Sequence, residues 1–164
     1  MKVIFTSSKL PFSWLIKWTF NQPVSHVAFV FDDKWLIHSN FLGVNFQWFS
    51  AWKKSNNVVF ELSYDLSLLQ QEALFQSILD SHAEDPYEWA GFLYFCWRGL
   101  LYKLFRMSLP KSNPLNGKGM LCTELLVSLP PWITNLPEDI DLSIITPYNL
   151  YEILSEAKQK KALS

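Results

Sequence analysis

The first 62 residues carry short apolar runs rich in Val, Phe and Ile, separated by polar residues, which is the pattern of β-strands. The predicted strands cover residues 3–6, 24–31, 35–39, 43–49 and 57–62, and a short helix covers residues 11–18. Asp32 and Asp33 supply a turn between the second and third strands, so these two strands form a hairpin. We expect this part of the chain to form a small antiparallel sheet.

After Tyr64 the hydrophobic residues recur with a helical period. Helices are predicted from an Asp65 cap to about residue 82, over residues 87–107, from about Cys122 to the residue before Pro130, and from Pro147 onward. Asp85 and Pro86 open the second helix, which is apolar around much of its circumference and is therefore expected to be largely buried. Because the predicted strands come first along the chain and the predicted helices come later, we expect a fold of the α+β class, with the Cys122 helix towards the C-terminal side.

Composition narrows the class of protein. The chain has 164 residues and no visible repeat or linker, so a single domain over residues 1–164 is predicted. Hydrophobic residues make up 49% and aromatic residues 16%, which excludes a largely disordered chain. The formal net charge is -1, so we expect no nucleic-acid partner bound through phosphate charge.

The apolar stretch over residues 89–107 is interrupted by three basic residues. A membrane span needs about 20 mostly apolar residues, so no membrane-spanning segment is predicted. The N-terminus has the pattern of a strand and lacks the apolar core of a secretory signal. We therefore expect a cytoplasmic protein with Cys96 and Cys122 reduced, although the sequence alone leaves a disulfide between them open.

Two histidines and a late cysteine supply the candidate chemistry. His26 and His38 lie twelve residues apart in the predicted hairpin, and Cys122 opens an apolar helical stretch. A thiol and an imidazole are the minimum parts of a thiolate nucleophile and its base. A helix N-terminus and a nearby imidazolium lower the pKa of a thiol, and N–H groups at a helix start can stabilise an oxyanion. Cys122 is therefore the candidate nucleophile, His26 the candidate base and His38 the residue that orients His26.

The hairpin makes this hypothesis testable. Side chains alternate between the two faces of a strand, so a two-residue loop at Asp32 and Asp33 pairs His26 with Ser39 and puts His38 on the opposite face. A three-residue loop places His26 and His38 on the same face. The catalytic hypothesis therefore requires an odd-length turn or a bulge between these strands.

Other interpretations of these residues stay open. A lone cysteine in an apolar helix is more often a small core residue, and lone strand histidines are more often structural than catalytic. Cys96 and His82 are expected to be structural. A metal bound by His26, His38 and Cys122 is supported only weakly, because the three residues do not cluster in the sequence. We therefore expect neither a metal nor an organic cofactor.

Local motifs around these residues resemble a known family. Residues 25–30 read Ser-His-Val-Ala-Phe-Val, and residues 122–126 read Cys-Thr-Glu-Leu-Leu. With the chain order His, His, Cys, they resemble the circularly permuted NlpC-type, papain-like cysteine hydrolases, and the His-His spacing is similar to the lecithin retinol acyltransferase-like branch. Thr123 departs from the commoner serine, and His38 stands where several relatives carry a carboxylate.

The resemblance implies a permuted papain-like fold with Cys122 as nucleophile, His26 as base and His38 as orienter. It implies more loosely a substrate-binding role for Tyr87. The reaction would pass through a thioester and cleave an ester or a peptide-like amide, such as one derived from peptidoglycan. Two alternatives remain: lipid acyl transfer or acyl hydrolysis by the same triad, and a catalytically inactive binding module on the same fold.

Overall fold

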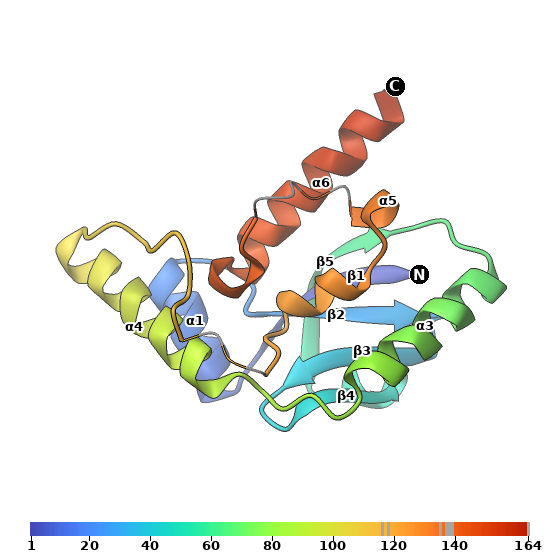
Figure 1. Ribbon diagram of the computed structural model, residues 1–164, viewed down its shortest axis with the longest axis horizontal. Coiled ribbons are helices and arrows are strands. Elements are labelled where there is room, and N and C mark those ends of the chain that lie inside the picture. The colour runs from blue at the N-terminus through green and yellow to red at the C-terminus, as the bar shows by residue number, and fades with distance from the viewer. Residues whose placement is uncertain (116, 118, 135, 137–139, 164) are drawn as a thin grey trace.

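A five-stranded antiparallel sheet forms the centre of the computed structural model, which describes residues 1–115, 117, 119–134, 136 and 140–163 (Figure 1). The strands are β1 (Lys2–Ser8), β2 (His26–Phe31), β3 (Trp35–Asn40), β4 (Gly43–Trp48) and β5 (Asn56–Ser63). Their order in the sheet is β4-β3-β2-β1-β5, and every neighbouring pair is antiparallel. Together with the helices described below, this sheet confirms the predicted α+β class.

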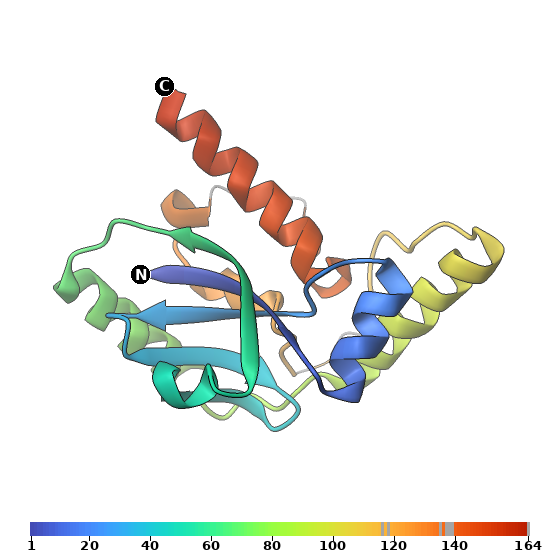
Figure 2. The same ribbon diagram turned by 180° about the vertical axis from the view of Figure 1, so that it is seen from behind.

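The helices are α1 (Pro11–Phe20), α2 (Phe49–Trp52), α3 (Leu68–His82), α4 (Trp89–Phe105), α5 (Pro131–Thr134) and α6 (Pro147–Leu163), with two short 3-10 helices, η1 (Glu124–Ser128) and η2 (Leu142–Ile144). Each face of the sheet is covered differently (Figures 1 and 2). On one face, Phe5 and Phe29 pack in the main core with residues of α3, η1 and α6. On the other, Ala28 and Leu36 pack against Trp52 of α2.

The β2–β3 hairpin has the register that the catalytic hypothesis requires. Phe31 pairs with Trp35, so the loop contains three residues, and Asp32 and Asp33 both adopt the left-handed conformation, with φ of 49° and 53°. The ladder ends with Phe29 opposite Ile37; continued by one residue, this register puts Ala28 opposite His38, so His26 and His38 lie on the same face. The prediction of an odd-length turn is confirmed.

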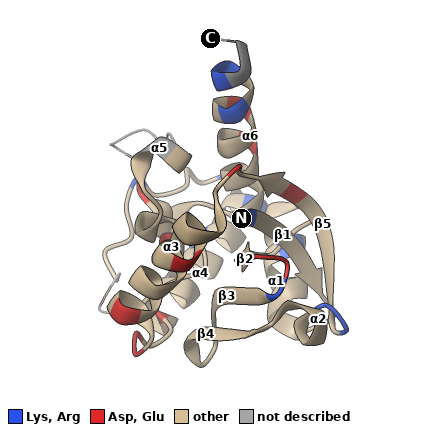
Figure 3. Ribbon diagram, turned by 90° about the vertical axis from the view of Figure 1, so that its right-hand side faces the viewer, with Lys and Arg blue, Asp and Glu red and all other residues tan. Residues whose placement is uncertain are grey.

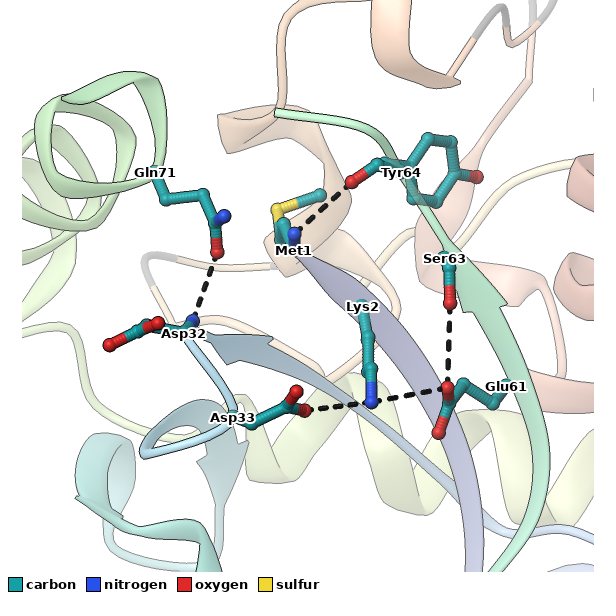
Figure 4. Close-up of polar contacts among 8 residues, drawn as sticks. All are labelled: Met1, Lys2, Asp32, Asp33, Glu61, Ser63, Tyr64 and Gln71. Atoms are coloured by element: carbon teal, nitrogen blue, oxygen red, sulfur yellow. Dashed lines mark hydrogen bonds and ion pairs between the residues drawn. The ribbon is translucent and has the colours of Figure 1, made fainter. Parts of the chain in front are cut away.

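The hairpin loop, at the end of β2 and β3 away from the histidines, is held by contacts with β1 and α3 (Figure 4). The Asp32 N–H donates to Gln71 of α3 at 2.9 Å, and Lys2 forms an ion pair with Asp33 at 2.7 Å. The N-terminal ammonium of Met1 donates to the Tyr64 carbonyl at 3.1 Å. These contacts fix the loop and with it the register of both histidine strands.

The starts of two helices differ from the prediction. α3 is capped by Ser67, whose hydroxyl accepts from the Gln70 N–H while the Gln70 side chain accepts from the Ser67 N–H, a reciprocal cap that Asp65 cannot make from its position. α4 begins at Trp89 with Glu88 as its cap, not at Pro86. The helix predicted from Pro147 is confirmed as α6.

Two further predictions about helices are wrong. η1 is a 3-10 helix of five residues in place of the expected α-helix, and Cys122 lies in the turn before it. α4 is not largely buried, because Leu93, Trp97 and Leu104 are more than half exposed on its outer side. No helix within the described residues is long and apolar enough to cross a membrane.

Candidate active site

A cavity of about 360 Å³ lies at the end of the sheet where β1 and β3 end and β2 begins. His26, His38, Cys122 and Tyr87 all line it, so the four residues singled out by sequence come together at one place. The histidines stand on the sheet face that Trp52 covers, whereas Cys122 packs against the main core on the other face. The cavity brings them together because it opens past the end of the sheet.

The two imidazoles are directly hydrogen-bonded. His26 Nε2 and His38 Nδ1 are 2.8 Å apart, and the rings are nearly perpendicular, at 83°. His38 is buried, with 4% of its surface exposed, and its ring also lies edge-on to Trp52, with centroids 6.0 Å apart. Within the described part of the chain, His26 Nδ1 has no hydrogen-bond partner. This nitrogen is therefore the one available to a nucleophile or a substrate.

Gln47 on β4 extends the chain of hydrogen bonds and was not recognised from the sequence. Its Nε2 lies 3.0 Å from His38 Nε2, and the Asn40 amide lies 3.4 Å from the same atom. When these amides donate, His38 Nε2 accepts and His38 Nδ1–H donates to His26. A half-turn of the Gln47 amide reverses the direction, so that His26 Nε2–H donates and His26 Nδ1 keeps a free lone pair. The Gln47 amide thus biases which tautomer His26 adopts, whereas the Asn40 amide, whose oxygen accepts from the Leu42 N–H and from Asn45, always turns its NH2 group towards His38.

The Cys122 thiol is surrounded by backbone N–H groups. Burial raises the pKa of the thiol to about 11, while the N–H groups of Val27, Thr123 and Cys122 itself act in the opposite direction. The five-residue η1 is too short for the helix-terminus effect expected from the sequence. Within the described residues Cys122 makes no hydrogen bond to His26. Val27 directly follows His26, so the thiol nevertheless lies beside the strand that carries the base.

Burial also acts on the two histidines. It lowers the pKa of His38 to about 4 and that of His26 well below 6.5, where the neighbouring His38 acts in the same direction. The thiol and both imidazoles are therefore neutral at pH 7. This result corrects the expectation of a thiol with a lowered pKa beside an imidazolium.

Glu88 holds the segment that leads to Cys122, and sequence reasoning did not recognise this role. Its carboxylate accepts hydrogen bonds from the N–H groups of Gly117 at 2.9 Å and Gly119 at 3.0 Å, and from Gly91 at 3.3 Å. Met120, which follows Gly119, donates its N–H to the Pro86 carbonyl at 2.9 Å. The buried carboxylate of Glu88, which accepts hydrogen bonds from glycine N–H groups, therefore holds the segment that leads to Cys122.

Side chains on both sides of Cys122 complete this positioning. The Ser39 hydroxyl on β3 donates to the Met120 carbonyl at 2.5 Å. The Thr123 hydroxyl donates to the Leu142 carbonyl at 2.8 Å. The Leu121 N–H donates to the Glu124 carboxylate at 2.8 Å. The turn is thus held on each side of the thiol, which favours a single placement of the sulfur.

Tyr87 belongs to an aromatic wall of the cavity. Its ring lies within 6 Å of the rings of Phe41, Trp89 and Phe92, and burial is the main cause that raises its hydroxyl pKa. The position fits a substrate contact, which stays a prediction. His82 forms an ion pair with Asp85 at 2.6 Å, as befits a structural residue.

Cys96, the other cysteine of the chain, lies in a separate hydrophobic cluster. Cys96 packs with Phe92 and Leu121 in a small cluster, and burial raises its pKa to about 12. Both cysteines are free thiols. In the part of the chain that the structure describes, no group of three or more His, Cys, Asp or Glu side chains could hold a metal ion.

Comparisons with protein families, curated proteins and solved structures add no relative to this picture. No family model, no curated protein and no solved structure matches this chain.

Proposed function

We propose that this protein is a cysteine hydrolase in which Cys122 is the nucleophile, His26 the general base and His38 the orienting residue. The observation that carries the proposal is the 2.8 Å hydrogen bond between His26 Nε2 and His38 Nδ1 beside a cavity that Cys122 also lines. We further propose that the chain order His26, His38, Cys122 reflects a permuted papain-like arrangement, as the motif resemblance implies. A cytoplasmic location stays a prediction.

The proposed reaction begins with a neutral Cys122 thiol and a neutral His26 imidazole. Cys122 Sγ attacks the carbonyl carbon of an amide or ester while its proton passes to His26 Nδ1, so charge develops only as the bond forms. The carbonyl oxygen becomes an oxyanion near the N–H groups that surround the thiol. His26 then gives the proton to the leaving amine or alcohol, which leaves a thioester on Cys122. Water, deprotonated by His26, attacks the thioester and releases the acid and the thiol.

His38 and Gln47 act on this cycle through His26. An imidazolium at His26 needs an acceptor at Nε2, and His38 Nδ1 can accept once His38 carries its own proton on Nε2. That tautomer requires the Gln47 amide oxygen to face His38 Nε2. We therefore propose Gln47 as a positioning residue for the base.

The lining of the cavity favours an apolar acyl group as the part of the substrate that it holds. Phe12, Ile16, Phe92 and Phe95 contribute to its walls, beside the polar end at the histidines. This observation supports the second candidate, an acyl hydrolase or acyltransferase that uses the same triad. A peptide-like substrate with a large apolar side chain fits the same walls. A binding module without chemistry is the remaining alternative.

The proposal is tested with p-nitrophenyl esters of increasing acyl length and with a matched series of anilides. We expect a burst of nitrophenol and a covalent acyl group on Cys122 by mass spectrometry. The adduct should be lost in Cys122→Ala and strongly reduced in His26→Ala, whereas Cys96→Ser should retain it. A folded wild-type protein that forms no adduct with either series, or one acylated equally at Cys96, would contradict the enzyme hypothesis. Transfer of the acyl group to an added amine would favour the acyltransferase.

A further inference from the structure

The outer side of α4 carries an apolar stripe that is largely exposed within the described residues, and its first member, Trp89, also packs against Phe12 of α1. Trp89, Leu93, Trp97 and Leu104 are 39% to 59% exposed. Their spacing of four, four and seven residues puts them on one side of the helix, because an α-helix has 3.6 residues per turn. The opposite side carries the buried Phe92, Phe95, Cys96 and Gly99. α4 therefore has two apolar sides, and only one of them is buried against the protein.

Helix α1 lies beside α4 and widens the apolar surface (Figures 1 and 2). The rings of Phe12 and Phe92, and those of Phe20 and Phe95, pack between the two helices. On the outside, Trp14 and Trp18 stack with centroids 5.8 Å apart and are 60% and 41% exposed. We refer to the exposed side chains of α1, α4 and the residues directly beside them, residues 9–20 and 89–111, as the α1–α4 surface.

The α1–α4 surface is also basic. Residues 9–20 and 89–111 contain six Lys and Arg residues and no Asp or Glu, whereas the whole chain has a net charge of -1. At 100° per residue, Arg98 and Lys103 lie on the two sides of the apolar stripe of α4, and the Arg98 guanidinium also donates to the Ser108 carbonyl at 3.0 Å. Lys103 Nζ lies over the Trp18 ring, 3.9 Å from its centroid, and also donates to the Trp18 carbonyl. Lysines also occur elsewhere, for example on the last turns of α6 (Figure 3).

We propose that the α1–α4 surface binds the interface of an anionic lipid bilayer. Exposed Trp, Leu and Phe beside Lys and Arg is the composition of helices that lie in the plane of a membrane. The aromatic and leucine side chains would enter the headgroup region, while the flanking basic groups would contact lipid phosphates. The absence of acidic residues from both segments favours a lipid surface of negative charge over an uncharged apolar partner.

The position of the cavity agrees with this occupant. Phe12, Ile16, Phe92 and Phe95 line the cavity from the same two helices that carry the surface. A molecule docked through α1 and α4 would therefore hold its cavity close to lipid. Membrane binding is nevertheless independent of the proposed chemistry, since it needs neither Cys122 nor the histidines.

The first test measures sedimentation of the Cys122→Ser protein with vesicles of phosphatidylcholine and phosphatidylglycerol in equal parts. Leu93→Gln/Leu104→Gln removes two exposed leucines of the stripe, and we expect it to weaken binding at least about tenfold. The matched control is Leu68→Gln/Leu69→Gln, two exposed leucines on α3. We expect the control to bind as the parent does.

The second test concerns charge. Arg106→Glu/Lys111→Glu should weaken binding at least about tenfold, because each basic residue near an anionic surface adds about a fivefold gain in affinity. Lys53→Glu/Lys54→Glu, the same reversal beside α2, should change it by less than about twofold. Binding should also fall in vesicles of phosphatidylcholine alone and at raised salt.

Three outcomes would overturn the proposal. The first is a parent protein that does not sediment with anionic vesicles. The second is equal loss of binding in the α3 or α2 controls. The third is a concentration-dependent dimer in solution that Leu93→Gln/Leu104→Gln disrupts, which would assign the surface to a second copy of the chain. Because the Cys122→Ser protein cannot form the proposed thioester, none of these outcomes depends on catalysis.

Discussion

Replacing Glu88 by Ala removes the carboxylate that joins the start of α4 to the segment before Cys122. The side chain is 7% exposed and accepts three backbone hydrogen bonds, from Gly91, Gly117 and Gly119. The Gly91 N–H is a helix cap, whose loss costs about 1 kcal/mol. The Gly119 N–H is half-buried and loses a charge-assisted partner, which costs about 1.5 kcal/mol.

Gly117 is exposed, so water replaces the carboxylate there and the loss is about 0.5 kcal/mol. The three contributions make Glu88→Ala less stable by about 3 kcal/mol. Because Gly117 and Gly119 lead into the turn that carries Cys122, we also expect slower acylation of Cys122. Glu88→Gln keeps one acceptor oxygen and should lose about half as much stability.

Urea unfolding followed by circular dichroism measures the change in the free energy of unfolding. Glu84→Ala is the matched control, since Glu84 is an exposed acidic residue just before the same helix. It should change the free energy of unfolding by less than about 0.5 kcal/mol. A Glu88→Ala protein within about 1 kcal/mol of the parent would refute the idea that this carboxylate anchors the nucleophile segment.

Three further predictions follow from the site and its surroundings. Gln47→Leu removes the amide beside His38 Nε2 and should lower kcat by about tenfold, which is the effect of losing one positioning hydrogen bond. Gln47→Glu retains an acceptor and should keep most of the parent kcat. Equal kcat in Gln47→Leu and the parent would contradict a positioning role for Gln47. The pKa of His38 is lowered from 6.5 to about 4, so between these pH values the unfolded chain binds more protons than the folded protein does. The contribution of His38 to the free energy of unfolding is therefore fully present above pH 6.5 and falls by about 3 kcal/mol as the pH drops to 4. Urea unfolding at a series of pH values should show a much smaller fall for His38→Asn. Gly43 has φ of +102°, and a Cβ there would stand 2.3 Å from the Asp85 carbonyl oxygen. Gly43→Ala should therefore lower the free energy of unfolding by at least about 2 kcal/mol. An unchanged melting temperature would show that the loop adapts freely.

Local sequence patterns predicted the helices and strands better than they predicted how these elements pack against one another. Alternating Val and Phe residues gave the strands, and the two aspartates gave the hairpin, because strand period and turn chemistry depend on neighbours in sequence. The burial of α4 was wrong for a related reason: an apolar circumference indicates burial only when other elements suffice to cover it. Here α1 covers one side of α4 and leaves Leu93 and Trp97 exposed.

The candidate site was predictable only in part. His26, His38 and Cys122 were identified because their residue types suggest one chemistry, and the structure places them at one cavity. Glu88 and Gln47 were not, because their roles arise from contacts with residues far along the chain or on a neighbouring strand. The neutral resting state was also missed, since a pKa depends on burial that no local motif encodes.

The order in which the sheet is built has a consequence for synthesis on the ribosome. All five strands are complete by Ser63, so the sheet and the His26–His38 pair can form while the rest of the chain is still being made. Cys122 joins them only after α3 and α4 have left the exit tunnel and the turn has returned to β2 and β3. A nascent chain therefore holds the paired histidines before it has Cys122, and the hydrolytic site that we propose would be complete only after the Cys122 turn has emerged.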